Sequence, residues 1–159
     1  ILYNVPGRTS SNMQAETTVR LANDFDNIIA VKEASGSLEQ AMEIINNKPS
    51  DFLVISGDDA LTLPMVASGG DGVISVIANA FPKGFSDMVT AALNDDMKTA
   101  RSLHYKYFSM IEYLFVEGNP AGVKAALKEL DIIGDAVRLP LVNVSEQTNK
   151  AIKGLIAIY

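Results

Sequence analysis

The residue of this sequence that is best placed for covalent chemistry is Lys32. It ends the apolar run of residues 28–31, and the small residues 34–36 follow Glu33. Short apolar runs between turn signals are typical of strands buried on both faces, so Lys32 is predicted where a buried strand meets its loop. A permanent charge is unfavourable there, whereas an amine that loses its proton can attack a carbonyl. On this stretch alone, a lysine that extends from the strand end into solvent is the commoner interpretation.

Two other polar features have simpler interpretations. Asp58 and Asp59 could suggest a metal, but two adjacent carboxylates in one turn cannot easily face one ion, so a helix N-cap is favoured. His104 is the only histidine, which excludes a histidine-rich metal site, and a single helical histidine is usually a core or boundary residue. We interpret the aromatic residues near it as packing residues: Tyr105, Tyr107, Phe108 and Tyr113.

The composition limits the function classes. The 159 residues are enough for one domain with an appendage, and 48% of them are hydrophobic. The net charge of -6 without a basic patch argues against nucleic acid as a partner, and no apolar run approaches the roughly 20 residues of a membrane span. The absence of cysteine excludes disulfides and cysteine nucleophiles and is compatible with the cytoplasm. The chain begins at Ile1, directly on a predicted strand, which is typical of a truncated sequence.

The elements that position Lys32 follow a strand–loop–helix pattern four times. Strands are predicted at residues 1–5, 28–32, 52–56 and 73–77. Helices are predicted after them, from a cap at Ser11 or Asn12, from Ser37 with Gln40 completing a capping box, at about 60–67 and at about 82–93. This alternation predicts an α/β fold with a parallel sheet and crossover helices. Polar residues end each strand, as at the catalytic face of a (β/α)8 barrel, of which four units are one half.

The alternation stops after the fourth unit. A long helix is predicted at 97–115, a second begins near Asn119-Pro120, and Ser145 caps a third. We therefore expect two domains, the C-terminal half of a (β/α)8 TIM barrel at 1–95 and a three-helix appendage at 96–159. No strand is followed by a nucleotide-binding glycine motif.

Several stretches together resemble one family. Residues 3–9, Tyr-Asn-Val-Pro-Gly-Arg-Thr, resemble a strand-loop of the dihydrodipicolinate synthase (4-hydroxy-tetrahydrodipicolinate synthase) family, and residues 32–36, Lys-Glu-Ala-Ser-Gly, resemble its Schiff-base strand. Residues 57–59 and 69–76 resemble its next two strand ends, and residues 115–124 are similar to the opening of its penultimate helix. In this order they are specific to the pyruvate-dependent class I aldolase (N-acetylneuraminate lyase) superfamily and favour this member. Because of this resemblance, we interpret Lys32 as a Schiff-base lysine and no longer as a lysine that extends into solvent.

The resemblance implies a fold, an activity and an assembly. The fold is a (β/α)8 barrel with a C-terminal helical domain, in a homotetramer built as a dimer of dimers. The activity is that of a lyase of the class I aldolase type, which condenses pyruvate with L-aspartate 4-semialdehyde in lysine and diaminopimelate biosynthesis. The family needs no cofactor beyond the covalent Schiff base between Lys32 and pyruvate. Its partners are these small substrates, with no nucleic acid and no membrane.

The resemblance also assigns roles to individual residues. Lys32 would attack the pyruvate ketone, and Tyr3 would shuttle protons because a phenol can both donate and accept. Arg8 has a planar fork suited to the carboxylate of the semialdehyde. The backbone groups of Gly57 and Ile74 would contact the pyruvate end.

The sequence departs from the family in one large respect, because the first four βα units are missing. In the family those units supply a threonine, a second tyrosine from the neighbouring subunit, the loop that holds the pyruvate carboxylate and the site of lysine feedback. The chain therefore requires the N-terminal half of the barrel as a partner, and its site is incomplete alone.

Two alternatives stay open at this point. One is an N-acetylneuraminate lyase-type or keto-deoxy-sugar aldolase, although Arg8-Thr9 after Pro6-Gly7 favours a short aldehyde with a carboxylate. The other is a non-catalytic half-barrel in which Lys32 is inert.

Overall fold

The computed structural model describes all 159 residues, and their contacts form two compact units. The first unit comprises residues 1–75 and 88–101, and the second comprises residues 76–87 and 102–159. No helix is both long enough and apolar enough to cross a membrane. The expected domain division after residue 95 stays a prediction.

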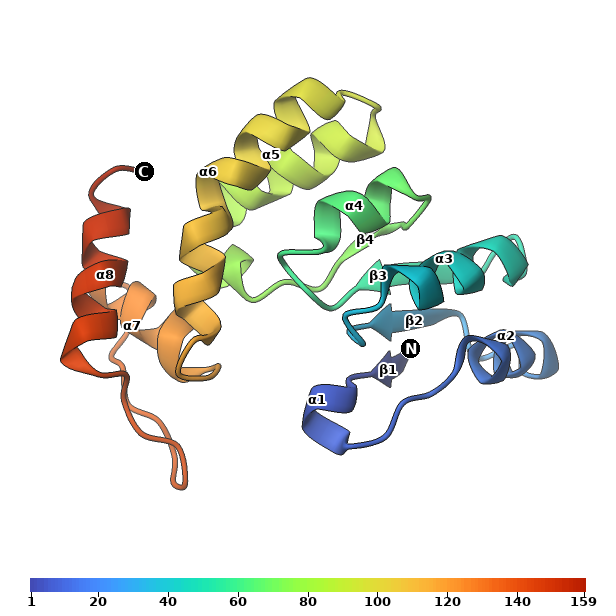
Figure 1. The fold of residues 1–159 in the computed structure, drawn as a ribbon, viewed down its shortest axis with the longest axis horizontal. Coiled ribbons are helices and arrows are strands. Elements are labelled where there is room, and N and C mark those ends of the chain that lie inside the picture. Colours follow the sequence, from blue (N-terminus) through green and yellow to red (C-terminus); the bar gives the residue numbers. More distant parts are fainter. The chain divides into compact units, whose positions relative to one another are not determined.

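The first unit is built on a parallel sheet of four strands in the order β1-β2-β3-β4. The strands are β1 (Leu2–Asn4), β2 (Ala30–Glu33), β3 (Leu53–Ser56) and β4 (Gly72–Val73). The crossover helices are α2 (Ala15–Asp24), α3 (Leu38–Asn47) and α4 (Thr62–Ala67) (Figure 1). The predicted α/β arrangement of parallel strands with crossover helices is confirmed.

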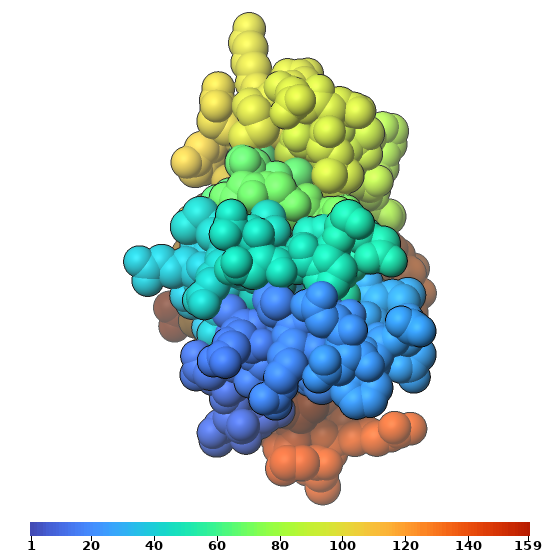
Figure 2. Space-filling model, turned by 90° about the vertical axis from the view of Figure 1, so that its right-hand side faces the viewer, coloured from blue at the N-terminus to red at the C-terminus, as the bar shows by residue number.

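The core of the first unit lies between the sheet and these helices. Val31 of β2 and Val54 of β3 are fully buried, and Ile44 of α3 is buried with them. Helix α3 contacts both α2 and α4, and the three helices follow one another on the face seen in Figure 2. Because side chains alternate along a strand, the residues between the buried ones point to the opposite face of the sheet.

The fourth strand is shorter than predicted. Residues 73–77 were expected to be extended, but β4 pairs with β3 only through Gly72 and Val73, and the short 3-10 helix η1 begins at Ile77 (Ile77–Asn79). The apolar residues that indicated a strand are instead divided between β4, a loop and η1. The reason is that β3, the one strand with which β4 pairs, ends at Ser56, which is the register partner of Val73.

The segment after β1 also differs from the expectation. Residues 6–9 form the short helix α1 (Pro6–Thr9), with proline at its first position, where its missing N–H is not needed. Helix α2 begins at Ala15 and is not capped by Ser11 or Asn12. The side chain of Asn12 instead bonds with Asn4 and Gln40.

The cap of α3 is formed in part as predicted. The Ser37 hydroxyl accepts the backbone N–H of Gln40 at 3.1 Å. The Gln40 side chain does not complete a capping box, because it donates to Glu33 and Asn12. Gln40 therefore joins α3 to the ends of the strands.

The second unit is helical apart from its connecting loops. It includes the start of α5 (Pro82–Leu93) and most of α6 (Met97–Phe115), whose other residues belong to the first unit. In the second unit α7 (Ala121–Glu129) packs against α8 (Glu146–Ile156). The three helices predicted after residue 95 are confirmed. Ser145 caps α8 as expected, because its hydroxyl accepts the backbone N–H of Thr148.

Candidate active site

Tyr3 and Lys32 lie side by side at the carboxyl ends of adjacent strands. They are register partners in the parallel pair β1–β2, so their side chains stand on the same face of the sheet. The Lys32 Nζ atom lies 4.1 Å from the centre of the Tyr3 ring. Lys32 is half-buried and Tyr3 is 52% exposed. A primary amine and a phenol are thus adjacent on an accessible surface, where they could attack a carbonyl and move a proton.

Gly57 provides the space that Lys32 occupies. A Cβ atom at this position would lie 3.0 Å from Lys32 Cε and 2.8 Å from the Cβ atom of Ala34. These separations are shorter than van der Waals contact, so only glycine lets the lysine side chain pass here. Its own N–H donates to the Glu33 carbonyl at 2.8 Å, which fixes the backbone beside the lysine.

The loop after β3 is shaped by buried hydroxyls. The Ser56 and Thr62 hydroxyls both donate to the Asp58 carbonyl oxygen, at 2.8 Å each. The Asp58 carboxylate accepts the backbone N–H groups of Ala60 and Leu61 in the turn before α4. The predicted helix N-cap is wrong, because the N-cap of α4 is Leu61. No three histidine, aspartate or glutamate side chains gather where they could hold a metal ion.

Ile74 and Arg8 lie on the loops that continue from the strand ends. The N–H of Ile74 donates to the Ser56 carbonyl at 2.9 Å, which extends the ladder beyond β4. Arg8 is an exposed residue of α1, the helix that directly follows β1. The structure therefore brings Tyr3, Lys32 and Gly57 into direct proximity, and it places the other two on segments that leave the same end of the sheet.

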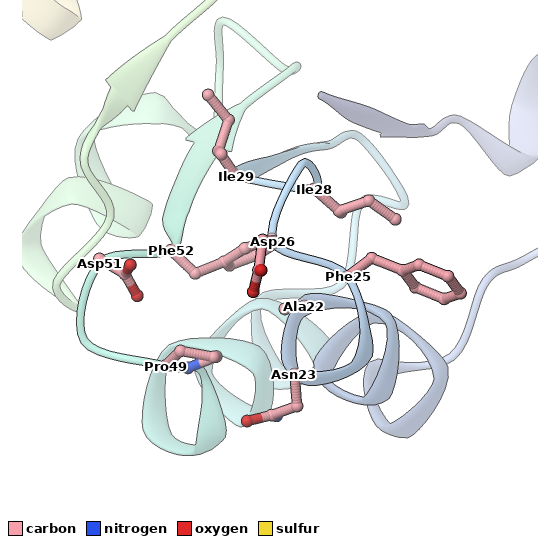
Figure 3. A pocket seen from close by; sticks show the side chains of 9 residues that line it. All are labelled: Ala22, Asn23, Phe25, Asp26, Ile28, Ile29, Pro49, Asp51 and Phe52. Atoms are coloured by element: carbon pink, nitrogen blue, oxygen red, sulfur yellow. The ribbon is translucent and has the colours of Figure 1, made fainter.

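A separate cavity lies at the amino ends of β2 and β3 (Figure 3). It has a volume of about 390 Å³ and is lined partly by Phe25, Asp26, Ile29 and Asp51. In parallel α/β sheets the chemistry gathers at the carboxyl ends, so this cavity is at the wrong end for catalysis. Lys32 is not among its lining residues.

Sequence reasoning did not include Asn4 and Glu33 in the site. Both are buried, at 2% and 1% exposure, and they pair in register directly after Tyr3 and Lys32. The signal was present, since each is a polar residue at a strand position that should face the apolar core. The sequence pattern identifies Asn4 and Glu33 only as polar residues at strand ends.

His104 is a core residue of α6, as expected. It is 5% exposed and packs against the rings of Tyr105 and Phe108. Burial lowers the pKa of His104 below its usual value, because the charged form of the ring is less well solvated there.

Comparisons with known proteins give a consistent result. The sequence matches the dihydrodipicolinate synthetase family over residues 1–158. It is 56% identical to 4-hydroxy-tetrahydrodipicolinate synthase of Flavobacterium psychrophilum, over 92% of this chain and 50% of the relative. It is 53% identical to the protein of the same name from Azobacteroides pseudotrichonymphae, over 100% of this chain and 54% of the relative.

A solved structure gives the same answer for the fold. Dihydrodipicolinate synthase from Thermotoga maritima has a TM-score of 0.96 and 38% identity, covering 98% of this chain and 54% of that chain. The chain therefore spans about half the length of the relatives that it matches.

Proposed function

Because the chain belongs to the dihydrodipicolinate synthetase family, we propose that it forms the catalytic half of a 4-hydroxy-tetrahydrodipicolinate synthase. The reaction is the condensation of pyruvate with L-aspartate 4-semialdehyde, in lysine and diaminopimelate biosynthesis. The observation that carries the proposal is the Lys32 amine, 4.1 Å from the Tyr3 ring at the carboxyl ends of β1 and β2.

The reaction begins with attack of the Lys32 nitrogen on the ketone carbon of pyruvate. A C–N bond forms, water leaves, and the product is a protonated imine. The imine draws electrons from the methyl group, which loses a proton and becomes an enamine. The imine is itself the electron sink, so no cofactor is needed.

The enamine carbon then attacks the aldehyde carbon of the semialdehyde, and the aldehyde oxygen takes a proton to become a hydroxyl. The amino group of the semialdehyde adds to the imine carbon and closes the ring. The C–N bond to Lys32 breaks, and the free amine is regenerated. The water released in imine formation is the only other product.

The other site residues serve these steps. Tyr3 is placed beside the amine, so its hydroxyl can carry protons to and from the reacting groups. Arg8 follows β1 and would bind the carboxylate of the semialdehyde through its planar fork. The backbone near Gly57 and Ile74 would contact pyruvate, because both residues adjoin the strand ends beside Lys32.

The active protein would be a complete (β/α)8 barrel in a homotetramer. This chain would supply the C-terminal half of the barrel at 1–95 and the helical domain at 96–159. The N-terminal half would supply the remaining four βα units, the pyruvate-binding loop and the tyrosine that crosses between subunits. The half-length match to the relatives supports this division.

The names of the relatives favour this reaction over the sugar-aldolase alternative, since those compared are synthases. A direct choice comes from activity of the complete enzyme. Turnover of pyruvate with L-aspartate 4-semialdehyde, and none with N-acetylneuraminate, is the expected result. The reverse preference would favour the alternative.

The covalent step is tested by trapping with borohydride. The complete enzyme is incubated with pyruvate and sodium borohydride, which reduces the imine to a stable secondary amine. The adduct should be found by mass spectrometry on the peptide that contains Lys32. Lys32→Arg should abolish it, because a guanidinium does not form imines at neutral pH.

Lys124→Arg is the matched control. Lys124 is also half-buried, but its Nζ atom donates to the Ala136 carbonyl in the second unit. This variant should keep the full adduct. A label on Lys124, or on no lysine, would show that the assignment of Lys32 is wrong.

A further inference from the structure

The reaction as described does not use the buried carboxylate of Glu33. Glu33 follows Lys32 on β2, so its side chain is on the opposite face of the sheet, and its exposed fraction is 1%. A buried carboxylate is unfavourable unless its oxygens are hydrogen-bonded. Its partners are therefore informative.

Every hydrogen bond to this carboxylate comes from a neutral donor. The Ser35 backbone N–H reaches Oε1 at 2.6 Å, and the Gln40 side chain reaches Oε2 at 3.1 Å. The Asn4 amide lies between the two oxygens, at 3.3 Å and 3.0 Å. Since donors face both oxygens, this arrangement of neighbours fits a side chain that accepts at both positions, which a carboxylate does and a glutamine amide does not.

Asn4 carries the network into the segment that bears Arg8. The side-chain Oδ1 of Asn4 accepts the backbone N–H of Met13 at 3.0 Å, and its side-chain NH2 group donates to Oδ1 of Asn12 at 2.9 Å. The segment of residues 5–12 thus leaves β1 at Asn4 and returns to the side chain of Asn4. Both ends of the Arg8 segment are fixed on one buried residue.

The same pair fixes the register of the two strands. Asn4 faces Glu33 in the same parallel ladder in which Tyr3 faces Lys32. A slip by one residue would move every side chain of a strand to the opposite face. The buried contact on the helix side of the sheet therefore determines which residues meet on the exposed side.

We infer that Asn4 and Glu33 are positioning residues of the reaction. Through their buried hydrogen bond they hold Tyr3 against Lys32, and through Met13 and Asn12 they hold the segment that carries Arg8. Neither touches substrate. The inference rests on the proposed function for its kinetic consequences, but the geometry that it claims is independent of any activity.

The variants follow from the pattern of donors and acceptors. Asn4→Asp places a carboxylate against Glu33 in a buried site, which should break the contact. Glu33→Gln replaces one acceptor oxygen with an NH2 group, which then faces the N–H donors that surround Glu33. The double exchange Asn4→Asp with Glu33→Gln reverses the direction of the bond. When the side-chain amides of Asn12 and Gln40 both flip, donors face acceptors again, so this variant should recover part of the loss.

The first measurement needs no catalysis. The lysines of the complete enzyme are reductively methylated with carbon-13, and the Lys32 signal is assigned by its loss in Lys32→Arg. Because the amine lies over the Tyr3 ring, its methyl signals should be shifted by the ring current. Asn4→Asp should remove this shift, and the double exchange should restore part of it.

The second measurement is the rate of pyruvate adduct formation, divided by the number of sites that are finally trapped. Asn4→Asp should lower this rate about 10- to 100-fold, the loss expected when reacting groups are misplaced by about 1 Å. Asn4→Asp should also raise the KM for the semialdehyde, whereas Glu33→Gln should affect mainly the rate.

Ile44→Val is the control for a simple loss of stability. Ile44 is a fully buried residue of α3 outside the network. It should lower Tm without changing the Lys32 shift or the rate per trapped site. If Asn4→Asp behaves in the same way, the pair is only structural and the inference is overturned.

A failure of the proposed function can be distinguished from a failure of the positioning role. A wild-type enzyme that shows the ring-current shift but forms no pyruvate adduct refutes the proposed function. In that case the shift in Asn4→Asp still decides the positioning role.

Discussion

At the scale of single residues, the site depends on how closely backbone and side chain approach one another. The Lys32 side chain passes over Gly57, where any larger residue would contact it. The amine and the Tyr3 ring are held together by the register of two short strands. Small changes of volume should therefore act on the chemistry as well as on stability.

Gly57→Ala should impair Schiff-base formation in the complete enzyme. The added methyl group would lie 3.0 Å from Lys32 Cε and 2.8 Å from Ala34 Cβ, so the lysine must move. A displacement of about 1 Å can cost about 100-fold in rate. Trapping with pyruvate and borohydride at short times measures this rate.

Gly154→Ala is the matched control for that variant. A Cβ atom at Gly154 of α8 meets nothing within 4 Å. It should leave the trapping rate unchanged and stabilise α8 slightly, because alanine is the better helix former. Equal rates for Gly57→Ala and wild type would show that the lysine does not need this space.

Arg8→Ala should weaken the binding of the aldehyde substrate and leave pyruvate activation alone. Arg8 lies on α1, the helix that follows β1, whereas the Lys32 amine that activates pyruvate is on β2. Loss of a charge-assisted bidentate contact costs about 2–4 kcal/mol. Steady-state kinetics should show a large rise in the KM for L-aspartate 4-semialdehyde, with little change in the KM for pyruvate.

Arg20→Ala provides the comparison for Arg8. Arg20 is an exposed arginine of α2. This helix packs on the face of the sheet that is opposite to Tyr3 and Lys32. Neither KM should change. Equal rises in both KM values for Arg8→Ala would instead indicate a structural role.

At the scale of the elements, α6 contains the one histidine of the chain. Burial lowers the pKa of His104 below its usual 6.5, so the ring gains a proton less readily in the folded state than in the unfolded chain. The unfolded state therefore binds more protons just below pH 6.5, and the free energy of unfolding falls as the pH drops through that value.

His104→Phe should remove this pH dependence, because phenylalanine keeps a ring beside Tyr105 and Phe108 but does not titrate. The Tm of the wild-type complete enzyme should fall more steeply than that of the variant from about pH 7 to about pH 5.5. Since the two proteins differ only at residue 104, the difference between the two profiles belongs to His104. Parallel profiles would contradict this prediction.

The elements themselves were largely readable from the sequence. Helix α6 has the bounds expected from its apolar spacing, and Ser37 and Ser145 cap the helices that they were predicted to cap. These features are local, since the spacing of residues along one helix decides them. The position of Lys32 at the end of a strand was local in the same sense.

The errors came from interactions between distant segments. The start of α2 was misplaced because Asn12, a good cap by type, bonds with Asn4 and Gln40 instead. The length of β4 depends on a pairing with β3 that no local pattern specifies. The Asn4–Glu33 contact was missed for the same reason, because it joins residues on two strands.

At the scale of the whole molecule, the sheet of this chain is open. Strands β1 and β4 are its edges, and each has one pairing neighbour. On the face opposite the helices, Tyr3, Leu53 and Ile74 are all more than 40% exposed. In a closed barrel this face is filled by side chains of all eight strands.

Residues 1–159 expressed alone should therefore fail to behave as a well-packed monomer. Four strands cannot close a barrel whose strand number, tilt and shear are linked. Unpaired edges recruit other strands, and several hundred Å² of uncovered apolar surface corresponds to roughly 10 kcal/mol of lost burial. That amount is comparable to the stability of a whole domain. We expect self-association or a molten state without synthase activity, measured by size-exclusion chromatography and near-UV circular dichroism.

Co-expression with the N-terminal half of the Flavobacterium psychrophilum relative is the matched comparison, and it should restore a soluble complex that forms the pyruvate adduct on Lys32. An active, well-packed monomer of residues 1–159 would show that the missing half is not required.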